Sequence, residues 1–372
     1  MTKFNIKKLV KPSINKIAKY IPGESKNNES IKYIKLSSNE SPFKVPGKIF
    51  SSLNKIVLNA NVYPDGDSQK LKGSIAKKFK LKKKQIICGN GSDDILSIIC
   101  QAFSKENTEV ICSEFGFIYY PIIARAAGCK VVTAKTKNLS ISCNNILKKI
   151  TSKTRIIFIA NPNNPTGTII LKNELTKFLD SVPKNIIVVL DGAYSEFIED
   201  KNYCDGIKLV SKYKNLIITR TFSKIFALAG LRLGWGYSNE ETIQLLEKIR
   251  GPFNVNSIAQ YIGCKILEEK SFLKNAREHN EKWLRLLPIK IKEIGLETTK
   301  SFTNFILVKV DPKKYSKKNI LLYLKKNKIL VRDLDSYNLK NYFRVSIGTD
   351  YEMQKFLRIL KISVNKNNEN KV

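Results

Sequence analysis

Two kinds of hydrophobic pattern alternate along the middle of the chain. Short apolar runs rich in isoleucine and valine are separated by longer segments in which apolar residues recur every three or four positions. Because the short runs are apolar throughout, each would be buried on both faces, as in a largely parallel sheet covered by helices. The predicted strands are 85–89, 109–113, 130–134, 155–160, 186–191 and 216–221.

The alternation of strands and helices predicts an α/β domain over residues 36–250. Its helical period is clear after the first of these strands, where Ile95, Leu96, Ile98, Ile99 and Phe103 fall on one face. We read residues 1–35 as an N-terminal arm, since the stretch from Tyr20 to Ser30, "YIPGESKNNES", is dense in turn formers.

The pattern changes after "RGPFNVNS", at about residue 250. Long charged helical segments lead to three predicted strands, "FILVKV" at 305–310, "KILVRD" at 328–333 and "YFRVSIGT" at 342–349. A capping box, Thr349-x-x-Glu352, opens the last helix. That helix should bury Met353, Phe356, Leu357 and Leu360, and its polar tail after about 364 should fray. Residues 251–372 are therefore expected to form a smaller α+β domain.

The charge balance is strongly basic, with 66 Lys and Arg against 32 Asp and Glu and a net charge of +34. Such a chain could attract nucleic acid, an anionic membrane or an anionic small molecule. The lysines are spread along the chain without an RNA-binding motif or a basic arm. We therefore expect neither nucleic acid nor membrane as a partner, and the charge leaves room for phosphate-bearing ligands.

Several absences narrow the function and the location. No run approaches the roughly 18 apolar residues that cross a bilayer, and the N-terminus lacks the apolar core of a secretory signal. The seven cysteines include no CxxC pair and sit mostly in apolar segments, which predicts buried reduced thiols and a cytoplasmic protein. A single histidine, His279, argues against a Ser-His-Asp triad or a histidine-rich site, and we expect no metal.

Candidate chemistry gathers where the predicted strands end, which is where ligands bind in open parallel sheets. In "CGNGSDD" (88–94), Gly91, Ser92 and Asp93 open a helix whose N–H groups could hold a phosphate, although the acids could simply compensate the helix dipole. "IANPNNPTG" (159–167) could present the Asn164 amide rigidly, or be a plain turn.

Two further strand ends carry charge. Asp191 ends the apolar strand of "VVLDGAY", where a buried carboxylate needs a partner, and Tyr194 follows on the same loop. Lys224 lies just past the strand 216–221. Burial there would lower its pKa and make its amine nucleophilic, suited to an imine with an aldehyde, whereas the default for a lysine is a snorkelling surface residue.

A phosphate cup is predicted beside this lysine. Thr221 and Ser223 can donate to a phosphate, and Arg232 adds a guanidinium. An aldehyde-binding lysine, a phosphate cup, a buried aspartate and an amide together describe a site for pyridoxal 5'-phosphate.

The motifs "NPNNPTG", "DGAY", "TFSKIFALAGLRLGW" and "FRVSIGT", in this order, resemble the class I/II aminotransferases of the pyridoxal-phosphate fold-type I superfamily, and within it the histidinol-phosphate branch. The likeness runs from "YIPG" through the last helix. It implies a mostly parallel seven-stranded sheet with helices on both faces, and a homodimer with shared active sites.

The resemblance also implies roles for individual residues. Lys224 would form an imine with the cofactor and then move protons, Asp191 would pair with the ring nitrogen, and Asn164 and Tyr194 would bind the ring oxygen. Tyr120 would stack on the ring, although "SEFGFIYYP" departs from the usual motif and Tyr119 is the alternative. The phosphate would be held by Gly91, Ser92, Asp93, Thr221, Ser223 and Arg232, with Tyr63 of a neighbouring subunit. Substrate would be bound by Arg344, Arg332, Asn39 and Tyr20 of the other subunit's arm.

The implied reaction moves an amino group between glutamate/2-oxoglutarate and histidinol phosphate/imidazole-acetol phosphate, in histidine biosynthesis. An aromatic amino-acid aminotransferase or a decarboxylase of a phosphorylated amino acid is the alternative within the same fold. A cofactor-retaining regulatory protein bound to nucleic acid is the alternative from another class. It would need a DNA-reading domain that the N-terminal arm has no room for.

Overall fold

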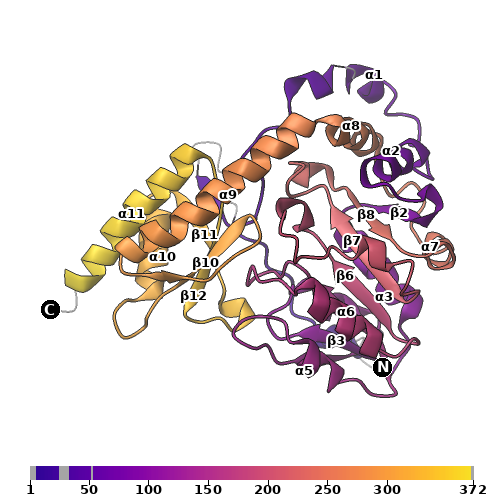
Figure 1. Cartoon of the computed structure of the whole chain (residues 1–372), viewed down its shortest axis with the longest axis horizontal. Helices are drawn as coiled ribbons and strands as arrows, with labels where there is room; N and C mark the ends of the chain where they lie inside the picture. The colour runs from indigo at the N-terminus through magenta and orange to yellow at the C-terminus, as the bar shows by residue number, and fades with distance from the viewer. Residues whose placement is uncertain (1–5, 25–32, 52, 370–372) are drawn as a thin grey trace, which may run out of the picture.

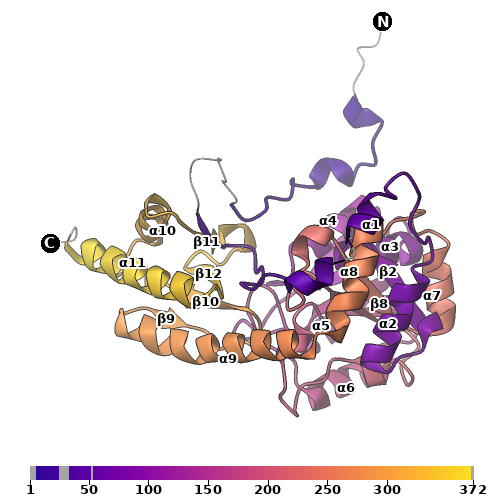
Figure 2. The same ribbon diagram turned by 90° about the horizontal axis from the view of Figure 1, so that it is seen from above.

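The computed structural model describes residues 6–24, 33–51 and 53–369. These residues fold into a larger and a smaller body, each built around its own sheet (Figure 1). The long helix α9 (Lys270–Glu293) runs from one body to the other. The N-terminal segment contains the short turns Ile6–Lys8 and Ile14–Lys16, and the second of them lies beside the helix Tyr119–Ala126, while the first described residues project outward (Figure 2).

The larger body is built on a seven-stranded sheet in the order β2-β8-β7-β6-β5-β3-β4. All six strands predicted for this domain are present, as β2 (Ile86–Gly89), β3 (Glu109–Ser113), β4 (Lys130–Ala134), β5 (Thr154–Ala160), β6 (Ile187–Asp191) and β7 (Leu216–Thr221). Strands β4, β3, β5, β6 and β7 run parallel to one another. This confirms the mostly parallel α/β architecture.

The seventh strand, β8 (Gly234–Tyr237), was missed by the hydrophobic pattern and is antiparallel to both of its neighbours. It is short and contains two glycines, which hide the strand signal. A β-carbon at Gly234 would lie 2.3 Å from the backbone nitrogen of Ser92. Glycine there lets β8 approach the start of α3 (Ser92–Phe103) closely.

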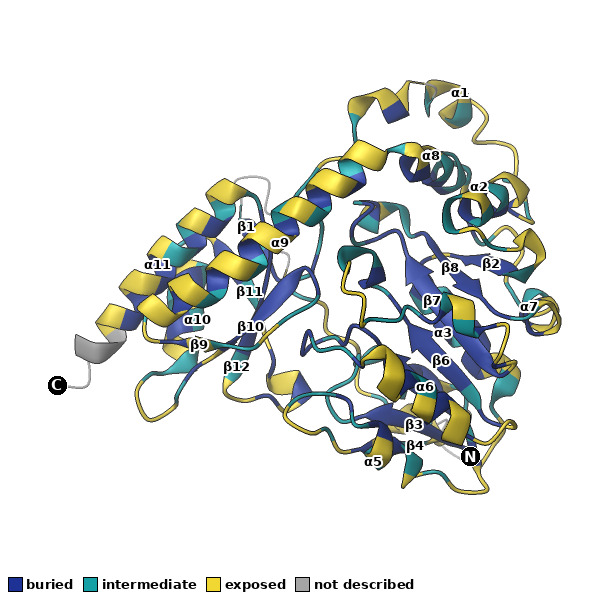
Figure 3. Ribbon diagram, viewed as in Figure 1, coloured by how far each residue is buried: buried dark blue, intermediate teal, exposed yellow. Residues whose placement is uncertain are grey.

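Helices cover both faces of this sheet, and all of its strands except the edge strand β4 are buried between them (Figure 3). On one face lie α2 (Gln69–Phe79), α6 (Lys172–Ser181) and α8 (Ser257–Glu268), and on the other α3, α4 (Tyr119–Ala126) and α7 (Glu240–Glu247). The predicted apolar face of α3 is correct, since Ile95, Leu96, Ile98 and Ile99 are buried. Short helices α1 (Leu53–Val57) and α5 (Cys143–Leu147) complete this body.

The smaller body has a five-stranded sheet in the order β1-β11-β12-β10-β9. The three strands predicted for it are β10 (Phe305–Lys309), β11 (Ile329–Asp333) and β12 (Tyr342–Ser346). The short strands β1 (Ile34–Leu36) and β9 (Glu297–Thr298) extend it. One face packs on α10 (Lys317–Lys326), α11 (Asp350–Glu369) and the second half of α9.

The predicted capping box begins α11, because the Thr349 backbone N–H donates to Glu352 Oε2 at 2.8 Å and the Glu352 N–H donates to Thr349 Oγ1. Met353, Phe356 and Leu360 are buried as predicted, whereas Leu357 is half-buried. The helix continues to Glu369, and the expected fraying of its tail after 364 stays a prediction.

The expected boundaries at 35 and 250 differ from the packing. Residues Ala259, Ile262 and Ala276 belong to the core of the larger body, whereas Trp283 and Leu287 belong to that of the smaller one. Strand β1 pairs with β11 of the smaller sheet. We therefore propose that the two domains divide within α9 and that β1 belongs to the small domain. Among the described helices, none has the length and apolar character needed to cross a bilayer.

Candidate active site

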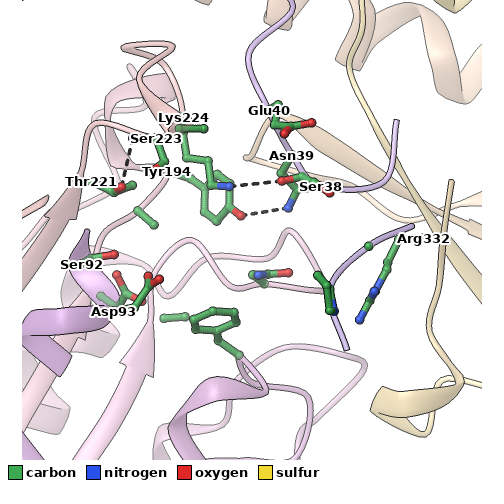
Figure 4. A pocket seen from close by; sticks show the side chains of 18 of the residues that line it. Ser38, Asn39, Glu40, Ser92, Asp93, Tyr194, Thr221, Ser223, Lys224 and Arg332 are labelled. Atoms are coloured by element: carbon green, nitrogen blue, oxygen red, sulfur yellow. Dashed lines mark hydrogen bonds between the residues drawn. The ribbon is translucent and has the colours of Figure 1, made fainter. Parts of the chain in front are cut away.

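A cavity of about 370 Å³ lies at the carboxyl ends of the parallel strands, closed on one side by the small domain (Figure 4). The polar residues predicted from separate strand ends meet here. Those that line it are Tyr20, Asn39, Ser92, Asp93, Tyr120, Asn164, Asp191, Tyr194, Thr221, Ser223, Lys224, Arg232, Arg332 and Arg344.

Lys224 lies three residues after β7, with its amine directed into the cavity (Figure 4). Its Nζ donates to the Ser38 carbonyl at 3.4 Å and lies 5.8 Å from the centre of the Tyr194 ring. No described carboxylate forms an ion pair with it. Burial, reinforced by the charge of Arg344, lowers the pKa of Lys224 from 10.5 to about 8. A nucleophilic amine is therefore available near neutral pH.

Asp191 ends β6 and is 5% exposed. Its carboxylate accepts hydrogen bonds from Tyr120 Oη at 2.7 Å and Thr219 Oγ1 at 3.0 Å. Burial raises its pKa in spite of both donors. A buried carboxylate of this kind favours a cationic group beside it in the cavity.

The start of α3 and the loop after β7 form a cup with several donors. Arg232 Nη2 donates to Asp93 Oδ2 at 2.8 Å, and Nη1 donates to Ser223 Oγ at 3.4 Å. Gly91 caps α3 next to the cavity, and a β-carbon there would lie 2.5 Å from Arg232 Nη2. A helix N-terminus, hydroxyls and a guanidinium are the donor set that a phosphate requires.

A second cationic region comes from the small domain. Arg344 on β12 is buried, and its Nη1 and Nη2 donate to Asn164 Oδ1 at 2.5 Å and to the Ser37 carbonyl at 3.1 Å. Its Nε is buried without a hydrogen-bond partner among the described residues. Arg332, on the neighbouring strand β11, lines the same cavity. This end can bind an anionic ligand group.

Asn39 and Tyr194 connect the two domains across the cavity. The Asn39 amide Nδ2 donates to Tyr194 Oη at 2.9 Å, and its backbone N–H donates to Ser346 Oγ at 2.8 Å (Figure 4). Asn39 adopts a positive φ of 56°, a conformation that non-glycine residues rarely hold outside constrained sites.

Tyr120 does not offer its ring face to the cavity as expected. The ring is 1% exposed and stacks on Phe158 with centroids 4.8 Å apart, so only its hydroxyl is directed at Asp191. Tyr119 does not line the cavity, and its hydroxyl contacts Ser97. Phe117 lines the cavity and was missed, and we propose it as the aromatic ring that faces the ligand.

Tyr20 also differs from the expectation that it serves another subunit. It lines the cavity of its own chain, because Arg332 Nη2 donates to the Ile21 carbonyl at 2.9 Å and holds this segment on the small domain. Tyr63 lies outside the cavity of its own chain, where it is 77% exposed and stacked on Phe253.

Sequence reasoning also missed Glu40 and Tyr337, which line the cavity. Glu40 follows Asn39 directly and forms an ion pair with Lys35. Tyr337 comes from a short turn after β11. Neither follows a strand of the larger sheet, and neither lies in a motif that carries the family resemblance.

The α/β fold, with a low-pKa lysine, a buried aspartate and a phosphate-binding cup at its strand ends, indicates an enzyme of the aminotransferase class. The chain belongs to the family of class I and II aminotransferases, whose family model matches residues 31–360. It is 39% identical to histidinol-phosphate aminotransferase of Pelagibacter ubique over 94% of this chain and 98% of that one. It is 36% identical to that of Maricaulis maris, over 92% and 95%.

Solved structures show the same fold. The histidinol-phosphate aminotransferase of Clostridium acetobutylicum superposes with a TM-score of 0.82 at 26% identity, over 90% of this chain and 99% of that one. That of Sinorhizobium meliloti, in complex with pyridoxal-5'-phosphate, superposes with a TM-score of 0.84 at 23% identity, over 90% and 92%.

Proposed function

We propose that this chain is a pyridoxal-phosphate-dependent transaminase that interconverts histidinol phosphate and 2-oxoglutarate with imidazole-acetol phosphate and glutamate, in histidine biosynthesis. The observation that carries the proposal is the convergence of Lys224, Asp191 and Arg344 on one cavity. The names of relatives at 36–39% identity over more than nine-tenths of the chain support the choice of substrate.

The cavity fits this cofactor. Ser92, Thr221, Ser223 and Arg232 would hold its phosphate, and Gly91 leaves the space that Arg232 occupies. When bound, the cofactor supplies an aldehyde and an electron-withdrawing ring. Asp191 would hold a proton at the ring nitrogen, since a buried carboxylate is stabilised by a cation beside it.

Lys224 would do the proton chemistry. Its lowered pKa would leave the amine partly neutral, so that it could hold the cofactor's aldehyde carbon and, when free, accept the proton that leaves the substrate's α-carbon and deliver it to that cofactor carbon. Tyr194 is held by Asn39 and would bind the ring oxygen together with Asn164. The segment around Tyr20 and the stretch from Ser37 to Glu40 line the cavity from the small-domain side and would limit the access of water.

The pH dependence of aldehyde capture should report the pKa of Lys224. Only the neutral amine is nucleophilic, so the rate at which cofactor-free protein captures pyridoxal phosphate should rise about tenfold per pH unit and level off above about pH 8. Stopped-flow absorbance measures the capture rate from about pH 6 to about pH 10. These limits lie about two pH units on either side of the pKa of Lys224. A rate still rising at the upper limit would mean that Lys224 keeps an ordinary pKa.

The substrate is tested by comparing histidinol phosphate with phenylalanine in single-turnover assays. Phenylalanine also carries a carboxylate that one guanidinium can meet, so only the second contact, worth about 1.5–3 kcal/mol, should favour the phosphorylated substrate, by about 10- to 10²-fold in kcat/KM. Replacing Arg332 by alanine should remove most of that preference. Equal rates with both substrates would favour an aromatic amino-acid aminotransferase.

We also infer a homodimer with shared sites. Tyr63, Val62, Val57 and Phe253 leave large apolar areas exposed along one groove, and a second copy of the chain would cover them. Tyr63 would then reach the phosphate end of the partner's site. The cytoplasmic location expected from the sequence stays a prediction.

Hybrid dimers test this sharing. Lys224→Ala and Tyr63→Ala proteins should each have little activity, and mixing them after mild dissociation should restore activity, because one site of each hybrid would carry neither substitution. If Tyr63 served its own chain's site, every site in the mixture would keep one defect and no activity would return. Sedimentation gives the mass of the wild-type protein, and a monomer would contradict the proposal.

A further inference from the structure

A second cavity, of about 310 Å³, lies behind the active site and shares no lining residue with it. It is open to solvent and is lined by the end of α2, the first two turns of α9 and the loops that follow Tyr194 and Lys224. Phe79 and Leu273 supply part of an apolar wall. Its size suits a small molecule.

The charges that line this cavity are unbalanced. Five are basic and two are acidic: Lys78, Lys270, Lys274, Arg277 and Arg220 against Glu196 and Asp205. Both carboxylates form ion pairs with Arg220, whose Nη1 lies 3.4 Å from Glu196 Oε1 and whose Nη2 lies 2.8 Å from Asp205 Oδ2.

The remaining cations differ in how they are compensated. Arg277 is paired with Glu199, and Lys274 lies 3.7 Å from Glu278. Lys78 and Lys270 form no ion pair with any residue that the structure describes. These two lysines are the uncompensated pair of the cavity.

The helix geometry gathers these cations at one end of α9. Helix α9 begins at Lys270 and has no acidic residue in its first turn, and the side chain of Glu269 does not cap it. Lys270, Lys274 and Arg277 stand four and three residues apart, on one face, at the end where the helix dipole is positive. Opposite them, burial and then the charges of Lys270 and Arg277 lower the pKa of Lys78.

A buried donor adds to this picture. Arg220 is 1% exposed, and its Nε has no hydrogen-bond partner among the described residues. Buried donors are rarely left unsatisfied. Cations gathered at a helix N-terminus around a small pocket are features of an anion site.

We propose that this second cavity binds a small phosphate-bearing anion between Lys78, Lys270 and the N-terminus of α9. Inorganic phosphate and an organic phosphomonoester share this chemistry, so the two probes are titrated separately.

The experiment titrates the cofactor-loaded protein with inorganic phosphate and with glycerol 3-phosphate by calorimetry at low ionic strength. The variant Lys78→Ala/Lys270→Ala should bind at least about tenfold more weakly than wild type at one site, the loss of two charge-assisted contacts. The control Lys77→Ala/Lys292→Ala removes the same charge from the same two helices, away from the cavity, and should bind as wild type does.

The results separate the outcomes. Loss with both probes in the cavity variant supports the shared phosphate chemistry, and loss with glycerol 3-phosphate alone identifies an organic occupant. Equal binding by both double variants would overturn the proposal, as would binding that disappears in Arg332→Ala protein and persists in the cavity variant. Lys270→Gln alone, at an exposed position, serves if the double variant is poorly folded, and amino transfer without added phosphate should be unchanged in it.

Discussion

Replacing Lys224 by alanine is expected to lower amino transfer by about 10⁴-fold or more and to remove the visible absorbance of the cofactor-loaded protein. The first effect follows because the proposed acid and base of the proton transfer is lost, a contribution of about 10² to 10⁴ on its own, together with the covalent attachment. The second follows because Lys224 is the only lysine among the described residues that line the cavity. Activity and spectrum are measured on the same purified sample.

A matched control shows whether the loss of absorbance and activity is specific to Lys224. Lys177→Ala makes the same substitution at an exposed position of α6 and should leave both the spectrum and the rate unchanged. A small primary amine added to the Lys224→Ala protein should restore part of the rate by supplying the missing base. An alanine variant that keeps the visible band and normal turnover would remove Lys224 from the proposed chemistry.

The fold was predictable to the extent that its strands are uniformly apolar. All six runs of that kind became strands of one sheet, because burial on both faces selects such sequences. Strand β8 escaped because Gly234 is required by the close approach of Ser92, a contact made across the fold. The boundary at 250 was placed where alternating strands and helices give way to long charged helical segments. The packing of α8 on the large sheet depends instead on contacts that local patterns do not reveal.

The candidate site was predictable where residues follow parallel strands, since such residues must meet at one edge of the sheet. Lys224 and Asp191 were found in this way. The orientation of Tyr120 was not, because its ring packs on Phe158 of a different strand. The position of Tyr20 was missed for the same reason, since Arg332 fixes that segment from more than 300 residues away. Side-chain direction depends on such distant partners.

Replacing Asp191 by asparagine is expected to cut turnover by about 10² to 10⁴-fold while the fold is retained. The amide keeps the shape and can still accept a hydrogen bond from Tyr120, but it carries no charge to oppose a protonated ring nitrogen. Breaking a buried charge pair costs about 3–5 kcal/mol, which corresponds to this range of rates. Tyr120→Phe, which keeps the carboxylate and removes one donor, should lose only about tenfold, the effect of a single hydrogen bond to a charged group.

Measurements of thermal stability distinguish a catalytic role of Asp191 from a role in supporting the fold. Burial raises the folded-state pKa of Asp191 above its unfolded value, so the ionised carboxylate costs folding free energy at neutral pH when no cation faces it. Cofactor-free Asp191→Asn protein should therefore unfold at the same temperature as wild type or higher, while binding of the cofactor should stabilise it less. Thermal unfolding with and without pyridoxal phosphate measures both. A cofactor-free variant that is markedly less stable would mean that Asp191 supports the fold, and near-normal turnover would remove its part in catalysis.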